Sequence, residues 1–196
     1  MGKSEAARMF RRLGVPVFDA DAEVHRLLAP GGAGFLPVAE TFPGAVVDGV
    51  IDRNRLGALV FDDTPALKRL ESILHPLVGR GRAGFMRRAT AMRVPVVVLD
   101  IPLLFETGGE KAVDYVAVVS APAHVQRRRA LRRPGMTVAK FESILARQVP
   151  DREKRRRADF VIPSGLGRRT ALQAIRRILG ILAAERSPMP TRSHYA

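Results

Sequence analysis

The sequence contains no cysteine, no tryptophan and only four histidines. Without cysteine the protein cannot form disulfides, use a thiolate nucleophile or bind zinc through thiolates. The histidines are scattered without the spacing of metal ligands, so we do not expect a structural zinc site. Any metal should therefore be bound by oxygen atoms, as magnesium is.

Long apolar runs are also absent, and acidic residues are in the minority. No uninterrupted apolar segment approaches the roughly 20 residues that a membrane helix needs, and Lys3 and Glu5 stand where a signal peptide would have an apolar core. We therefore expect a cytoplasmic protein outside the membrane. The formal net charge is +14, which predicts anionic ligands: nucleic acid, acidic lipid headgroups or phosphorylated small molecules.

What the sequence does have is enough apolar material for one globular domain, with 196 residues of which 46% are hydrophobic. Four short apolar runs predict strands, at 15–18, 94–101, 113–120 and 160–162. The second and third are nearly continuous apolar runs, which is typical of parallel strands covered on both faces. Helical patterns lie between them, so we predict an α/β layer fold.

The first predicted helix begins almost at residue 1. Ala6, Met9, Phe10 and Leu13 recur at helical spacing, and Gly14 follows as a stop. No strand precedes this helix in the sequence.

Further helical patterns follow in the middle and at the end of the chain. Segment 35–92 reads as a helical and loop-rich insertion, in which Thr64 and Pro65 are predicted as N-cap and first-turn residues and Pro76 as a helix end. Segment 124–158 is very basic and could form a mobile flap that faces phosphate. Leu172, Ile175, Ile178, Leu179 and Leu182 mark a last amphipathic helix.

The first candidate site is Gly2-Lys3-Ser4, which opens the first helix and matches the second half of a phosphate-binding loop. In such a loop, backbone N–H groups bind phosphate oxygens, Lys reaches the β- and γ-phosphates, and Ser holds magnesium. Three residues are a weak signal, and the first glycine and its four spacers are missing. Glu5 adds a negative charge beside the anion site, although it favours the helix dipole.

Two carboxylates follow the first predicted strand. Asp19 and Asp21 can both point to one side at its carboxyl end, where open α/β sheets bind ligands. One of them could accept the proton of an attacking hydroxyl. Alternatively, Asp21 caps the next helix, with His25 one turn further on, and spacing alone favours the cap.

Asp100 and two arginines complete the candidates that spacing suggests. Asp100 ends a buried strand, where phosphate-loop enzymes place a magnesium-linked carboxylate; a loop-capping role is the alternative. Arg129 and Arg133 are predicted to share one helix face, from which they could reach a transferring phosphoryl group. Several neighbouring arginines leave the choice open.

A larger set of motifs occurs in a characteristic order: GKS, LGVPVFDADAEVHRLL, ILHPLV, VVLDIPLLFE, ILARQ and ADFVI. Over about residues 2–183, this set resembles the dephospho-coenzyme A kinase family. The resemblance implies a phosphate-loop kinase fold with a five-stranded parallel core. It also implies transfer of the ATP γ-phosphoryl group to the ribose 3′-hydroxyl of dephospho-coenzyme A, giving coenzyme A and ADP.

By the same resemblance, Asp21 is the general base. Lys3 and Ser4, together with Gly2, bind the ATP phosphates and magnesium, and Asp100 supports the metal. Arg129 or Arg133 comes from a lid. The residues expected to border the acceptor are Asp19, His25, His75, Leu103, Leu104 and Glu106. The expected partners are ATP and dephospho-coenzyme A, with Mg²⁺ as cofactor. We expect neither membrane nor nucleic acid as a partner, and the sequence carries no signal of oligomeric state.

The resemblance also implies a division of the single kinase domain. The expected core is 1–34, 93–122 and 159–185; the acceptor-binding insertion is 35–92, the lid is 123–158, and a disordered tail is 186–196.

Two departures from the family pattern leave alternatives open. The family begins with a strand and a complete glycine-rich loop that this sequence lacks, and Pro163-Ser164-Gly165 replaces the usual residues near adenine. Either the true start lies upstream of Met1, or the chain is an inactive relative that still binds the coenzyme A precursor. A basic nucleic-acid-binding protein is the third possibility, but only 6% of the residues are aromatic and no recognition motif is present.

Overall fold

The computed structural model describes residues 2–61 and 63–186. The chain divides into two compact units, one formed by Val17–Ile101 and the other by Met1–Pro16 together with Pro102–Ala196. The predicted tail, 186–196, lies outside the described residues except for Arg186, the last residue of a helix. The predicted boundaries of core, insertion and lid stay predictions.

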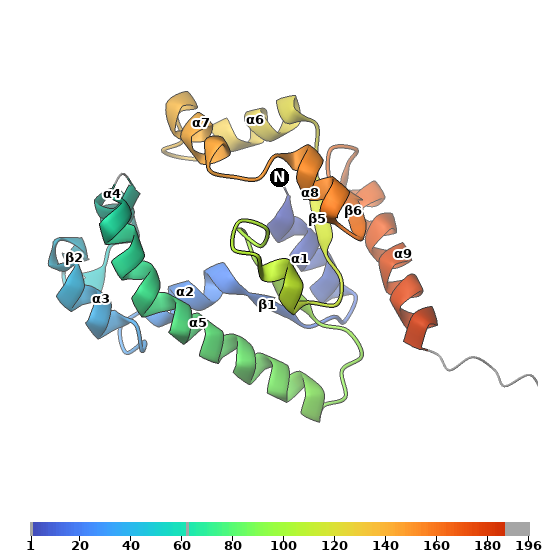
Figure 1. Ribbon diagram of the computed structural model, residues 1–196, viewed down its shortest axis with the longest axis horizontal. Coiled ribbons are helices and arrows are strands. Elements are labelled where there is room, and N and C mark those ends of the chain that lie inside the picture. The colour runs from blue at the N-terminus through green and yellow to red at the C-terminus, as the bar shows by residue number, and fades with distance from the viewer. Residues whose placement is uncertain (1, 62, 187–196) are drawn as a thin grey trace, which may run out of the picture. The chain divides into compact units, whose positions relative to one another are not determined.

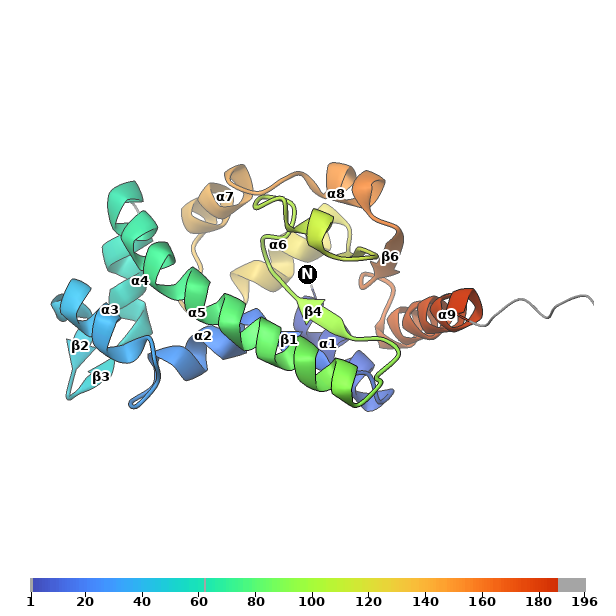
Figure 2. The same cartoon turned by 60° about the horizontal axis from the view of Figure 1, so that its bottom comes forward.

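The unit Val17–Ile101 is mainly helical (Figure 1). Its elements are β1 (Val17–Asp19), α2 (Ala20–Leu28), α3 (Phe35–Thr41), η1 (Pro43–Ala45), β2 (Val46–Val47), β3 (Val50–Ile51), α4 (Arg53–Phe61), α5 (Thr64–Ala91) and β4 (Val98–Asp100). The hairpin β2–β3 and helices α3 and α4 gather around one end of α5 in both views (Figure 2). A core that includes Leu28, Val38, Phe42, Leu56 and Leu74 holds this end together.

Helix α5 runs through Pro76, so the prediction that His75-Pro76 ends a helix is wrong. A proline inside a helix costs about 3 kcal/mol, because it removes a hydrogen bond and its ring meets the preceding turn. Leu74 and Leu77 on either side are buried, and burying a leucine contributes about 1.5–3 kcal/mol. Burial of Leu74 and Leu77 therefore offsets the cost of the proline, and the helix continues.

Two helix caps are also shifted from their predicted positions. Asp19, not Asp21, caps α2: its Oδ1 accepts a hydrogen bond from the backbone N–H of Ala22 at 3.0 Å. Asp63, not Thr64, caps α5. In both cases a carboxylate lies one residue before the first helical residue, where it can reach the free N–H groups of the first turn. Asp21 lies inside that first turn.

The second unit contains α1 (Lys3–Arg12), η2 (Gly109–Ala112), β5 (Ala117–Ser120), α6 (Ala123–Leu131), α7 (Val138–Ala146), α8 (Asp151–Arg157), β6 (Phe160–Pro163) and α9 (Arg168–Arg186). Helix α1 packs on α9, which also contacts β6. Ala6, Met9 and Phe10 of α1 are buried as predicted. Ala171, Ile175 and Ile178 form the buried stripe of α9.

The basic segment forms three helices, α6, α7 and α8. Helix α6 ends at Leu131, and Arg133 follows in a turn. The prediction that Arg129 and Arg133 share a helix face is therefore wrong. Gly135, with a φ of 71°, lies in the irregular stretch between α6 and α7.

The fold is mixed α/β with parallel strands, as expected of a phosphate-loop kinase. Within the described residues the strands pair two by two: β1 with β4 and β5 with β6 in parallel, and β2 with β3 antiparallel. The continuous five-stranded sheet is therefore not seen there, because these ladders share no strand. Within residues 2–61 and 63–186, no helix is long and apolar enough to cross a membrane.

Candidate active site

Gly2 begins helix α1 in a conformation that favours glycine. Its φ is 100°, in the left-handed region, and no side chain caps the helix there. A Cβ atom on this residue would lie 3.2 Å from the Cβ of Ser164, which follows β6. A side chain at position 2 would therefore be both strained and crowded. Lys3 and Ser4 are the first residues of the helix proper.

Arg129 of α6 reaches the same place. Its Nη1 donates to Ser164 Oγ at 3.3 Å and its Nη2 to the Ser164 carbonyl oxygen at 2.9 Å. The guanidinium Nη1 lies 3.8 Å from the position that a Cβ of Gly2 would occupy. Arg129 is thus held beside the N-terminus of α1, where helix dipole and cation both favour an anion.

Glu5, the acidic residue that counted against an anion site, is neutralised by two cations. Its carboxylate forms ion pairs with Arg168 at 2.5 Å and with Arg8 at 2.6 Å. Opposite charges this close cancel most of the field of the carboxylate at the start of α1. Arg168, at the start of α9, was not among the predicted site residues.

Asp19 and Asp100 end the two strands of the parallel pair β1–β4. They are partners in the register of this pair, after Val17 with Val98 and Phe18 with Leu99. Asp100 is buried, with 6% exposure. The fold thus places two carboxylates at neighbouring strand ends, as the sequence predicted for each of them separately.

Asp21, His25 and His75 are exposed residues of the same unit. Asp21 projects from the first turn of α2, and its side chain is not the helix cap. The Nδ1 of His25 lies 3.1 Å from Nη1 of Arg53 in α4, and because a guanidinium can only donate, Nδ1 is the acceptor in this contact. Arg53 is therefore a cation beside His25, a residue expected to border the acceptor substrate. Sequence reasoning missed Arg53 because 28 positions separate it from His25.

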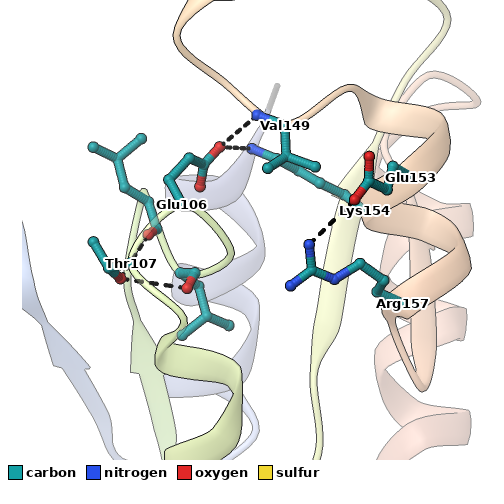
Figure 3. A network of polar contacts seen from close by, with 8 residues as sticks. Glu106, Thr107, Val149, Glu153, Lys154 and Arg157 are labelled. Atoms are coloured by element: carbon teal, nitrogen blue, oxygen red, sulfur yellow. Dashed lines mark hydrogen bonds and ion pairs between the residues drawn. The ribbon is translucent and has the colours of Figure 1, made fainter.

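Glu106 is at the centre of a network in the other unit (Figure 3). Its Oε1 accepts from Lys154 Nζ at 2.7 Å and from the backbone N–H of Val149 at 3.0 Å. Burial alone would raise the pKa of Glu106, but the hydrogen bonds from Lys154, its own N–H and Val149 lower it overall.

Leu103 and Leu104 precede Glu106 on the same loop. Leu103 is exposed, whereas Leu104 packs against the cluster of Phe105, Val116 and Val118.

Seven of the predicted site residues form two groups. Gly2, Lys3, Ser4 and Arg129 come together at the start of α1, and Asp19, Asp21 and Asp100 come together around the end of β1. Among the residues that the structure describes, no cluster of three or more His, Cys, Asp or Glu could hold a metal ion by itself. Sequence reasoning treated Ser164 only as a departure from the family pattern, and its contact with Arg129 carries no sequence signal.

Comparison with known proteins identifies the family. A sequence model described as dephospho-CoA kinase matches residues 1–166. A dephospho-CoA kinase of Mesorhizobium japonicum is 53% identical over 186 residues, which cover 95% of this chain and 93% of that protein. That of Rhodospirillum rubrum is 57% identical, over 90% of this chain and 84% of that protein.

Solved structures agree with this result. The crystal structure of TT1252 from Thermus thermophilus matches with a TM-score of 0.74 and 37% identity, over 95% of this chain and 93% of that one. A dephospho-CoA kinase from Campylobacter jejuni matches with a TM-score of 0.67 and 25% identity, over 94% and 93%. The chain belongs to the dephospho-CoA kinase family.

Proposed function

We propose that this protein transfers the γ-phosphoryl group of ATP to the ribose 3′-hydroxyl of dephospho-coenzyme A. The observation that carries the proposal is the family match over most of the chain. In the reaction the 3′-oxygen bonds to the γ-phosphorus, the bond to the β–γ bridging oxygen breaks, and coenzyme A and ADP result. We also propose the cytoplasm as the compartment, where ATP is supplied.

The start of α1 would bind the phosphates of ATP. Gly2 lets the backbone approach the phosphates, Lys3 supplies a cation, and Ser4 an oxygen ligand. Arg129 is our first choice for the arginine that stabilises charge on the transferring group, because its guanidinium lies beside Gly2. Arg133, in a turn beyond the end of α6, is the alternative.

The acceptor would be handled by the residues around β1 and α2 and by the loop 102–108. Asp21 is the proposed general base: its exposed carboxylate, not used as a helix cap, is free to accept the proton of the 3′-hydroxyl. Such a base contributes through position and protonation state. The residues proposed to border the acceptor are Asp19, His25, His75, Leu103, Leu104 and Glu106.

Magnesium fits the donor atoms that the chain offers. Mg²⁺ prefers oxygen ligands and often uses one or two carboxylates together with substrate phosphates, so a site without three clustered side chains is sufficient. We propose Ser4 and Asp100 as the protein groups on the metal side; Asp100 is a buried carboxylate at a strand end. When bound, the ion would neutralise charge on the phosphates.

The test is a kinase assay with an Asp21→Asn variant. The protein is incubated with ATP, magnesium and dephospho-coenzyme A, and formation of coenzyme A and ADP is followed. Asp21→Asn keeps the shape but removes the base, so we expect kcat to fall about 100-fold or more.

The matched control is Asp48→Asn, in the exposed β2–β3 turn, where Asn suits the positive φ of 48° and activity should not change. A wild-type protein that binds dephospho-coenzyme A without phosphorylating it would overturn the proposal in favour of an inactive relative. An Asp21→Asn variant with wild-type kcat would remove Asp21 from the reaction.

A further inference from the structure

A half-buried carboxylate joins two segments of the chain that lie far apart in the sequence. Glu106 belongs to the loop 102–108, which follows β4. Its Oε1 receives both Lys154 Nζ and the Val149 N–H, which belong to the corner 149–154 at the C-terminal end of the basic segment (Figure 3). The side chains of Lys154 and Glu106 are only 8% and 13% exposed.

Packing and a second polar contact fix the same corner. Val149 packs against the apolar cluster that contains Phe105, the neighbour of Glu106. Asp151 Oδ2 accepts a hydrogen bond from Ser120 Oγ at 2.7 Å, and Ser120 is a buried residue at the end of β5. The corner is therefore held on two sides, by the loop 102–108 and by a strand end.

The neighbouring helix of the basic segment lacks such anchorage. All residues of α7, every one of which the structure describes, are exposed or half-buried. The end of the basic segment is therefore anchored through the corner and through α8, where Arg157 also pairs with Glu110 and lies over the Phe105 ring, and not through α7. An ion pair with a buried lysine suits this purpose, because removing Glu106 leaves the charge of Lys154 uncompensated and strongly disfavours the arrangement.

We propose that Glu106 is a positioning residue that fixes the corner 149–154 to the loop 102–108, and that this latch keeps the basic segment placed for the kinase reaction. Glu106 Oε1 acts through Lys154 and Val149, without needing to touch the substrate. This role deepens the proposed function and rests on it for its effect on catalysis. The latch itself is a property of the fold and can be measured separately.

The other oxygen of Glu106, Oε2, suggests a competing role, which is direct binding of the acceptor substrate. Oε2 is buried and has no hydrogen-bond partner among the described residues. A donor of the acceptor substrate could use it, as the resemblance implies for this loop. The two roles differ in their dependence on Lys154: a latch needs Lys154, whereas a substrate contact through Oε2 does not.

The experiment compares Glu106→Gln, Lys154→Met and the double variant with wild type. Glu153→Gln is the matched control, since it makes the same chemical change in the same helix at a side chain that is 44% exposed. Amide hydrogen exchange of the segment 147–152, which contains the Val149 N–H, reports the latch. Steady-state kcat and the KM for dephospho-coenzyme A report its effect on the reaction.

If Glu106 is a latch, both single variants exchange about tenfold faster in this segment and lose about tenfold in kcat, because small misplacements of catalytic groups are costly. The KM for dephospho-coenzyme A stays within about twofold, as expected when positioning and not acceptor binding is lost. The double variant is no worse than either single one, since it leaves no unpaired buried charge. It also supplies the test if a single variant fails to fold. Glu153→Gln behaves as wild type.

Other outcomes overturn the latch. If Glu106→Gln raises the KM for dephospho-coenzyme A about tenfold while Lys154→Met does not, Glu106 binds the acceptor. If neither single variant changes exchange of the segment 147–152, the corner does not depend on the pair. If wild type has no kinase activity but both variants exchange faster, the proposed function fails and the latch stands.

Discussion

Helices α1 and α2 begin in different ways. At α2, the carboxylate of Asp19 accepts the N–H of Ala22, and at α5 Asp63 does the same for Ala66 at 2.8 Å. At α1 the corresponding position is Gly2, in the left-handed region and without a side-chain cap. The N-termini of α2 and α5 are therefore capped by carboxylates of the protein itself.

The difference separates structural helix starts from one suited to a ligand. A capping carboxylate satisfies free N–H groups but would repel phosphate, whereas Gly2 leaves backbone N–H groups and the helix dipole for an external anion. Two further features at α1 point the same way. Arg129 lies beside Gly2, and the one acidic residue of the first turn, Glu5, is paired with Arg8 and Arg168. We infer that the N-terminus of α1 is uncapped because it binds an anion, and not by chance.

Among changes that test this contrast between helix starts, the largest expected effect comes from removing the cation beside α1. Arg129→Ala should lower kcat about 100-fold, because a donor that stabilises transition-state charge is lost. Arg133→Ala should cost less than about tenfold, since a more distant arginine contributes less to that charge. Arg128→Ala, a neighbouring exposed residue of α6, is the control. Equal losses for positions 129 and 133 would refute our choice of Arg129.

Giving the start of α1 a side chain should have a smaller effect. Gly2→Ala places a Cβ at a φ of 100° and 3.2 Å from Ser164 Cβ, so Ser164 must shift, and Arg129 with it. We expect the KM for ATP to rise about tenfold, as uniform binding is weakened.

Gly14→Ala is the matched control for this substitution. Gly14 has a φ of 80° at the other end of the same helix, with nothing within 4 Å of an added Cβ. It should lose stability in the same way and leave the KM for ATP unchanged. A rise in KM for both variants would mean that helix stability, not the phosphate site, is responsible.

Local patterns predicted the parts of this site that depend on neighbours in sequence. Apolar periodicity located α1 and α9, and apolar runs located the strands that end in Asp19 and Asp100. These features follow from backbone geometry and burial, which repeat every few residues.

Features that depend on tertiary contacts could not be predicted in this way. Glu106 and Val149 are 43 positions apart, and Arg129 and Ser164 are 35 apart, so no spacing rule connects them. Helix α5 continues through Pro76 because neighbouring leucines are buried, which is a property of the packed unit. The sequence did not predict Asp19 as the cap of α2, because Asp19 and Asp21 are equally suitable by residue type. Only the backbone shows which of them precedes the first helical residue.

The smallest expected effect concerns a structural helix start. Asp63→Ala removes the cap of α5 and should lower the free energy of unfolding by about 1 kcal/mol, measured by urea denaturation. Neither the KM for ATP nor that for dephospho-coenzyme A should change, because this carboxylate caps the helix by accepting the N–H of Ala66 and is not among the residues proposed for either substrate. Asp63→Asn, which caps as well as Asp, should restore the stability. If Asp63→Ala instead changed the KM for ATP as much as Gly2→Ala does, the two kinds of helix start would not differ in function.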